Sequence, residues 1–131
     1  MKLKLLYLLC FLGTFKIEAQ VFEVQTLKLS GDTDKRINLV ILSEGYQAIE
    51  FAKFKDDAES LVTNMFSQSP FLEYADYFNV HIIKVPSNES GADHPGTAID
   101  VTEPLNIPVT EVDTYFNATF DAFGYHRFLY Y

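Results

Sequence analysis

The sequence predicts an α/β fold built around a strand–helix–strand (βαβ) unit with a mostly parallel sheet. Two runs of branched apolar residues, Ile37–Leu42 and Phe78–Val85, have the composition of strands that are buried on both faces of a sheet. Between them lies Phe51–Phe66, in which apolar residues recur at intervals of three and four, as on one face of a helix. This order of elements implies a right-handed crossover and a parallel strand pair.

The N-terminal residues 1–19 have the layout of a secretory signal peptide rather than of a folded element. Lys2 and Lys4 form a short basic start, and Leu5–Phe15 is mostly apolar but too short to span a bilayer stably. Ala19 offers a small residue at the predicted cleavage point. A buried N-terminal helix is the alternative, but nothing in the run gives such a helix a polar face. We therefore expect a secreted or periplasmic protein that begins at Gln20.

Charge and cysteine content exclude several classes of function. The chain has 18 acidic and 10 basic residues, for a formal net charge of -8, which argues against nucleic acid or an anionic membrane as partner. Its one cysteine, Cys10, lies within the predicted signal peptide. The mature protein is therefore expected to use no disulfide, no cysteine metal ligand and no cysteine nucleophile.

The segment before the βαβ unit is expected to add a further strand. Val21–Leu29 alternates loosely between apolar and polar residues, which indicates a strand. Ser30–Lys35 follows, with the glycine and aspartates usual in a connection. Ile37–Leu42 is then nearly continuous in apolar residues, with Asn38 as the one exception.

The helix expected over Phe51–Phe66 has one apolar stripe, which ordinary core packing explains. The stripe consists of Phe51, Phe54, Ala58, Leu61, Val62, Met65 and Phe66. The helix should end near Ser67–Pro70, where polar residues and a proline interrupt the pattern.

After Phe78–Val85 the chain is expected to become irregular, because four prolines interrupt it from Pro86 onward. The final segment, Thr114–Tyr131, holds eight aromatic residues and could form a strand and the start of another element. Only one long helix is predicted, although a sheet of this kind needs helices on both faces. We therefore interpret residues 20–131 as an incomplete domain.

Two loops are candidates for function because each follows a strand of the predicted parallel pair. Loops at the carboxyl ends of parallel strands border the ligand crevice of open α/β sheets, and Ser43–Tyr46 and Ser87–Gly96 both occupy this position. Ordinary turn formation is the alternative for both loops. The candidates for lining a substrate cleft or for structuring these loops are Glu44, Tyr46, Glu89, Asp93 and His94.

Motifs for metal or nucleophilic catalysis are missing from the 131 residues. The histidines, His81, His94 and His126, are far apart in the sequence, and there is no HExxH pair for zinc. There is also no GxSxG motif, no phosphate-binding glycine loop and no dinucleotide fingerprint. We assign no catalytic residue, no metal ligand and no cofactor to this chain.

Four segments follow one another along the chain: RINLVILSEGY, MFSQSPF, FNVHIIKVPSNESGADHPG and FDAFGYHRFLY. Together they resemble the first part of the catalytic domain of the IgA peptidase family of zinc metallopeptidases. The most specific part of the resemblance is Glu89–Gly96, directly after the second strand of the predicted pair. From the resemblance we would expect aspartate at the position where this sequence has Glu44.

This resemblance implies a metzincin-like fold and a secreted zinc endopeptidase that acts on proteins or peptides. In such enzymes an HExxH helix binds zinc, and its glutamate is the general base. The resemblance places that helix beyond Tyr131, so zinc is expected for the complete enzyme and not for this chain, which we expect to be inactive alone. The preferred role for Asp93 and His94 is to hold their loop beside the cleft by hydrogen bonds, with direct substrate contact as the alternative. A secreted non-enzymatic binding module, or a truncated remnant on the same scaffold, is the alternative function.

Overall fold

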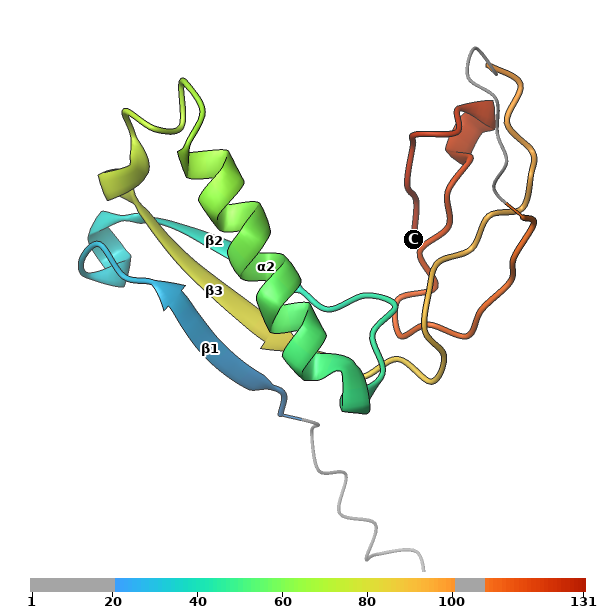
Figure 1. Ribbon diagram of the computed structural model, residues 1–131, viewed down its shortest axis with the longest axis horizontal. Coiled ribbons are helices and arrows are strands. Elements are labelled where there is room, and N and C mark those ends of the chain that lie inside the picture. The colour runs from blue at the N-terminus through green and yellow to red at the C-terminus, as the bar shows by residue number, and fades with distance from the viewer. Residues whose placement is uncertain (1–20, 101–107) are drawn as a thin grey trace, which may run out of the picture.

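The computed structural model describes residues 21–100 and 108–131, which form a small sheet with one long helix, followed by a lobe that is mostly loop (Figure 1). The predicted signal peptide and Cys10 lie outside the described residues. We call residues 87–100 and 108–131 the C-terminal lobe. The strands and the long helix are β1 (Glu23–Lys28), β2 (Ile37–Leu42), α2 (Phe51–Phe66) and β3 (Phe78–Lys84). Short 3-10 turns are η1 (Thr33–Lys35), η2 (Ala48–Glu50), η3 (Ala75–Tyr77) and η4 (Ala122–Gly124).

The sheet has the strand order β1-β3-β2, with β3 in the centre. β2 and β3 are parallel, in a register that runs from Ile37 opposite Phe78 to Leu42 opposite Ile83. This confirms the predicted α/β fold and its βαβ unit, with α2 as the crossover helix. β1 pairs antiparallel with β3, so the described sheet is mixed.

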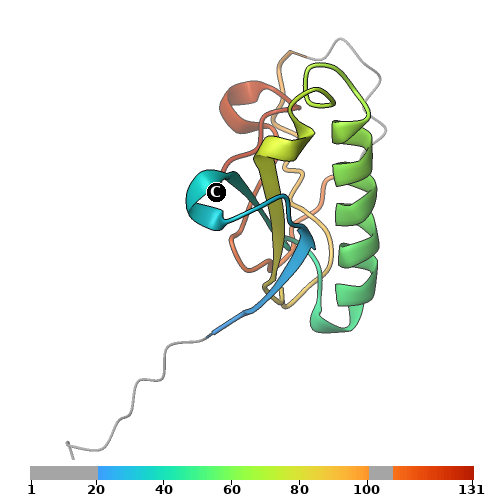
Figure 2. The ribbon, with the colours of Figure 1, turned by 90° about the vertical axis from the view of Figure 1, so that its left-hand side faces the viewer.

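One face of the sheet is packed against α2 (Figure 2). Phe54 and Ala58 of the helix form the buried core with Ile82 of β3, and Leu27 and Ile41 pack against it. Side chains alternate along a strand, so Val80 and Ile82 face the same side, and both are fully buried. Leu61, which the apolar stripe predicts to be in the core, is instead exposed.

The other face of the sheet has no helix over it in the part of the chain that the structure describes (Figure 2). Val24, Val40 and Leu42 lie on this face, and their exposed fractions are 60%, 46% and 45%. The prediction that Ile37–Leu42 is buried on both faces is therefore wrong here. The physical reason is that α2, the one long helix among the described residues, covers only the opposite face of the sheet.

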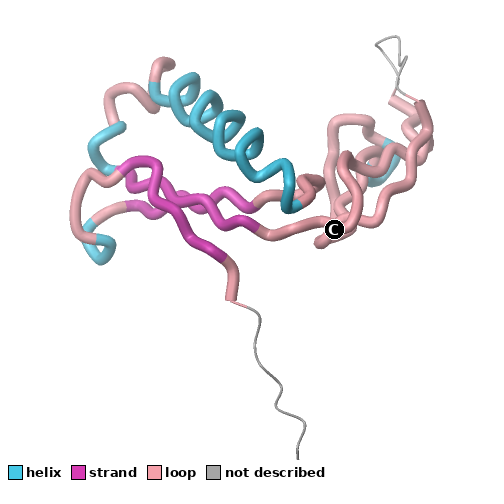
Figure 3. Tube along the Cα trace, turned by 60° about the horizontal axis from the view of Figure 1, so that its bottom comes forward, coloured by secondary structure: helices cyan, strands magenta, loops and turns pink. Residues whose placement is uncertain are grey.

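The C-terminal lobe is held together by isolated β-bridges rather than by strands (Figure 3). The bridges join Asp93 to Thr119, His94 to Thr110, and Thr119 to Tyr130. The prediction of a strand within Thr114–Tyr131 is therefore wrong. Positive φ angles at Asn117, Asp121 and Phe123 turn the backbone repeatedly and interrupt any longer ladder. In the regions that are described, no helix has the length and apolar character needed to cross a bilayer.

Candidate functional site

The two candidate loops leave the same edge of the sheet and lie side by side, as the parallel pairing of β2 and β3 requires. Ser43, fully buried at the end of β2, joins them at their base. Its Oγ donates a hydrogen bond to the Val85 carbonyl at 2.7 Å and accepts one from the Val85 amide at 2.6 Å. Further out, the Gly91 amide donates to the Gly45 carbonyl at 3.0 Å. The two loops thus form one continuous backbone platform.

The close crossing of these loops depends on Gly45. Its φ of +72° lies in the left-handed region, and a Cβ added at this position would stand 1.9 Å from the Gly91 carbonyl oxygen. Because that neighbour is backbone, the loop would have to move to make room for any side chain. Residue 45 therefore needs glycine for conformation and for space.

The Glu44 carboxylate is turned toward the C-terminal lobe, where it accepts three hydrogen bonds. Its Oε1 accepts one from the Thr114 hydroxyl and one from the Ala118 amide at 3.0 Å. Its Oε2 accepts one from the Phe116 amide at 3.1 Å. Both carboxylate oxygens are therefore used to bind one short segment that lies about seventy residues further along the chain.

Three side chains of the second loop bind the same segment. The Ser87 Oγ accepts hydrogen bonds from the amides of Gly45 and Tyr115, both at 3.1 Å. Glu89 accepts from the Asp113 amide at 2.7 Å, and Asp93 accepts from the Val112 amide at 2.6 Å. Together with Glu44 these side chains take five backbone amides of residues 112–118. We call Glu44, Ser87, Glu89 and Asp93 the acceptor cradle.

His94 contacts a later part of the lobe through its backbone and its ring. Its amide and carbonyl pair with Thr110 at 2.9 and 3.0 Å. Its imidazole stacks on Phe120, with ring centroids 4.3 Å apart and an interplanar angle of 7°. The two neighbouring side chains thus have different partners: the Asp93 carboxylate accepts a hydrogen bond from the Val112 amide, whereas the His94 ring stacks on Phe120.

Tyr46 lies on the helix side of its loop, and its side chain takes no part in the cradle. Its hydroxyl donates to Asp57 of α2 at 2.8 Å, and its ring packs against Phe54. Burial, followed by the bond to Asp57, raises the pKa of Tyr46. Hydrogen bonds from Lys53 and then from Tyr46 hold the pKa of Asp57 below its usual range.

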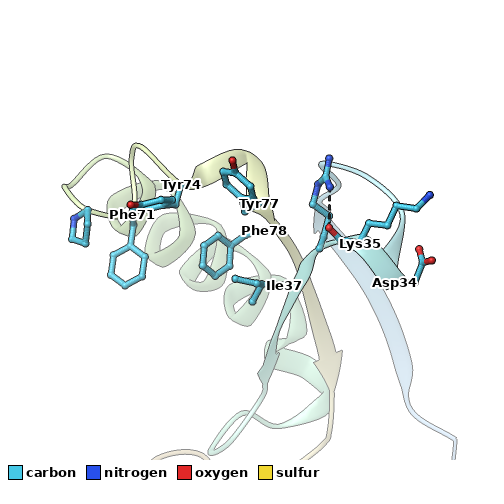
Figure 4. A pocket seen from close by; sticks show the side chains of 9 residues that line it. Asp34, Lys35, Ile37, Phe71, Tyr74, Tyr77 and Phe78 are labelled. Atoms are coloured by element: carbon cyan, nitrogen blue, oxygen red, sulfur yellow. Dashed lines mark hydrogen bonds between the residues drawn. The ribbon is translucent and has the colours of Figure 1, made fainter.

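A separate apolar groove lies at the opposite end of the parallel strands, where β2 and β3 begin (Figure 4). Its volume is about 580 Å³, and none of the five candidate residues lines it. Phe71, Tyr74 and Tyr77 come from the connection after α2, and they face Ile37 and Phe78 across the groove (Figure 4). Asp34, Lys35, Arg36 and Pro70 complete the lining.

A comparison with models of protein families finds a match over most of the chain, including the whole βαβ unit and the cradle. The model of the family described as IgA Peptidase M64 matches residues 25–131. The chain belongs to the IgA peptidase M64 family. No curated protein matches the chain significantly. The match confirms the resemblance of the four sequence segments and relates the chain to metallopeptidases.

The described residues of this chain offer no site for the metal ion of a metallopeptidase. Within residues 21–100 and 108–131 there is no group of three or more His, Cys, Asp or Glu side chains placed to hold an ion. The three histidines have separate neighbours. His81 bonds to Thr26 on the sheet, His94 stacks on Phe120, and His126 contacts Asp100 at 3.3 Å. The residues do not fit a zinc site, and no catalytic step is derived from them.

Ser43, Ser87 and Thr114 are important residues of this M64 edge that sequence reasoning missed. Each is less than 6% exposed, and each has its hydroxyl in a contact between segments far apart in the chain. A small polar residue just after an apolar strand was a usable signal for Ser43, which follows β2 directly, and for Ser87, which follows β3 after Val85 and Pro86. Thr114 had no such signal, since it lies in a segment without regular structure.

Proposed function

We propose that this chain is the N-terminal part of the catalytic domain of a secreted zinc metallo-endopeptidase, and that it is inactive alone. The observation that carries the proposal is the M64 match over residues 25–131, in a chain that contains no HExxH motif. In metallopeptidases, zinc activates a water molecule for attack on a peptide carbonyl. The scaffold described above would support that chemistry by shaping the edge of the sheet, with protein or peptide as substrate.

Zinc content and peptide cleavage test this proposal directly. The purified chain should bind less than about 0.1 zinc ion per molecule, because a catalytic zinc site needs three protein ligands that converge on the ion. It should also leave a mixture of unstructured peptides uncut. Zinc bound at one ion per chain, together with cleavage that a chelator abolishes, would refute the claim that the chain is inactive alone.

Within the proposed peptidase, Asp93 and His94 serve to hold the loop in place beside the cleft. This role is supported by the bond from the Val112 amide to Asp93 and by the stacking of His94 on Phe120. Asp93→Ala in a protein that also carries the zinc helix should lower the thermal midpoint and leave KM for a peptide substrate unchanged. A raised KM at unchanged stability would show instead that Asp93 contacts the substrate.

Secretion is part of the same proposal and has its own test. The basic start, the apolar run and Ala19 support removal of residues 1–19. Mass spectrometry of the exported protein should find Gln20 as its first residue. A mass that includes residues 1–19 after export would contradict the proposed cleavage.

A secreted binding module is the second candidate, and the apolar groove is the observation that favours it. The groove is lined by aromatic side chains, which provide large contact areas in binding sites. A monomeric chain with a cooperative thermal transition and no zinc would favour the module over a peptidase fragment. A chain that is only partly folded would favour the fragment.

A further inference from the structure

We infer that Glu44 is a positioning residue whose carboxylate sets the place of the C-terminal lobe at the carboxyl ends of β2 and β3. The role concerns how the lobe is held, so it does not depend on whether the chain takes part in catalysis. It rests on the contacts of the carboxylate, on the kind of segment that it binds, and on the glycine that follows it.

Glu44 makes more contacts with residues 112–118 than any other side chain of the cradle. It accepts three hydrogen bonds from this segment, whereas Ser87, Glu89 and Asp93 each accept one. Two of the residues that it binds, Thr114 and Ala118, are 3% and 5% exposed. Hydrogen bonds to a charged acceptor are stronger than those between neutral groups, most of all where water is excluded.

The bound segment has no secondary structure that could hold it instead. Residues 112–118 belong to no strand and no helix, and the nearest ladder contacts are the isolated bridges at Thr110 and Thr119. Backbone amides that leave water need an acceptor. For Phe116 and Ala118 that acceptor is Glu44. Ser87, Glu89 and Asp93 bind the amides of residues 112, 113 and 115, whereas the end of the segment, Phe116–Ala118, is bound by Glu44.

Gly45 completes the arrangement, because it lets the Glu44 loop approach the lobe closely. The Gly45 carbonyl accepts from the Gly91 amide, and its own amide donates to Ser87. Glu44 thus projects from a loop that is itself fixed to the start of the lobe. A carboxylate on a rigid support can define the position of the segment that it binds.

The test compares amide hydrogen exchange in wild type, Glu44→Gln, Glu44→Asp and the control Glu111→Gln, all in the 131-residue chain. Glu111 is an exposed glutamate in the same part of the lobe, so its variant matches the loss of charge. In Glu44→Gln the amides of Phe116 and Ala118 should exchange about tenfold faster, as the loss of charge-assisted hydrogen bonds implies. The amides of β3 should keep their wild-type rates.

The remaining variants distinguish positioning from a general loss of stability. Glu44→Asp keeps the charge on a side chain that is one methylene shorter, so its exchange rates should fall between those of wild type and Glu44→Gln. Glu111→Gln should match wild type. Unchanged exchange at Phe116 and Ala118 in a folded Glu44→Gln protein would overturn the inference.

If Glu44→Gln also speeds amide exchange in β3, a milder variant is needed to separate positioning from a general loss of stability. Thr114→Val removes one donor and leaves the carboxylate charged. It should speed exchange at Phe116 and Ala118 while β3 keeps its wild-type rates. An effect on β3 alone, or no effect at all, would contradict a positioning role for Glu44.

Discussion

At the scale of single residues, Gly45 decides how closely the two loops at the carboxyl edge can approach. Replacement by alanine combines a strained φ of +72° with a Cβ placed 1.9 Å from the Gly91 carbonyl oxygen. Strain of this kind costs about 1–2 kcal/mol. Moving the backbone to make room for the Cβ would also break hydrogen bonds of the cradle, which adds to the cost. We expect Gly45→Ala to lower the free energy of unfolding by more than about 2 kcal/mol in denaturant titrations.

Gly96→Ala is the matched control for this prediction. Gly96 has nearly the same positive φ, +70°, but an added Cβ would meet a methyl carbon of the exposed Val109 side chain at 2.9 Å rather than backbone. The substitution therefore adds similar strain next to a neighbour that can move. Gly96→Ala should destabilise the chain less than Gly45→Ala, and equal losses would show that contact between the loops is unimportant.

Asp57 makes the contact between Tyr46 and α2 sensitive to acid. The pKa of Asp57 is lowered in the folded chain by hydrogen bonds from Lys53 and Tyr46, so folding favours its ionised form. The stability that this provides is present at neutral pH and is lost as the pH falls below about 4. Asp57→Asn should therefore lower the thermal midpoint at pH 6, and its difference from wild type should shrink toward pH 2.5.

The neighbouring Asp56 provides the control for the acid effect. Asp56 is also exposed on α2, and Asp56→Asn removes the same charge from the helix. The difference in thermal midpoint between Asp56→Asn and wild type should not shrink as the pH falls. A difference between Asp57→Asn and wild type that stays constant from pH 6 to pH 2.5 would contradict the assigned role of Asp57.

At the scale of elements, α2 is fixed to the sheet through a small number of side chains. Phe54 is 3% exposed and touches both Tyr46 and the core residue Ile82. Truncation of a buried phenylalanine costs about 3–5 kcal/mol, whereas a whole domain is stable by about 5–15 kcal/mol. Phe54→Ala should therefore remove a large part of the stability, lowering the free energy of unfolding by about 3–5 kcal/mol in denaturant titrations followed by circular dichroism.

Leu61→Ala is the corresponding control on the same helix. Leu61 is 56% exposed, so its truncation removes little buried area and keeps a strong helix former in place. Its cost should be within about 0.5 kcal/mol of zero. A large loss for Leu61→Ala would mean that the outer part of the apolar stripe is packed in solution.

The elements of this chain could be predicted because their signals are local. Apolar periodicity gave the bounds of α2, and continuous branched residues gave β2 and β3 within one residue. The cradle could be predicted only in part: the parallel pair placed Glu44 and Glu89 at one edge, but their partners were hidden. Residues 112–118 have no periodicity, since side chains distant in sequence hold them.

Burial was harder to predict than element type, because it depends on what lies beside each strand. Ile37–Leu42 has the composition of a strand covered on both faces, yet the structure shows β2 as an edge strand with one bare face. Leu61 similarly has the right spacing for the core, seven residues after Phe54 on the same side of α2, yet its side chain is 56% exposed. The composition of a strand indicates the environment that suits it, whereas its exposure depends on which other elements of the chain pack against it.

At the scale of the whole molecule, the acidic charge and the bare sheet face act in opposite directions. A net charge of -8 favours solubility through mutual repulsion. Val24, Val40 and Leu42 instead present an apolar surface on the bare face, and in the described part of the chain β2 has an unpaired edge beside Val40 and Leu42. Apolar patches and unpaired edges of this kind promote association. Because the patch is local while the charge is spread out and screened by salt, we expect association to dominate at physiological ionic strength.

The double variant Val40→Thr, Leu42→Thr tests this expectation. Threonine is β-branched, as suits a strand, and its hydroxyl makes the face more polar. The double variant should raise the monomer fraction in sedimentation velocity. The control Ile49→Thr also changes an exposed apolar residue, but one that lies in η2, away from the sheet face, and should leave association unchanged. If both variants associated as wild type does, the bare face would not be the cause, and the exposed aromatic residues of the C-terminal lobe would be the next surface to alter.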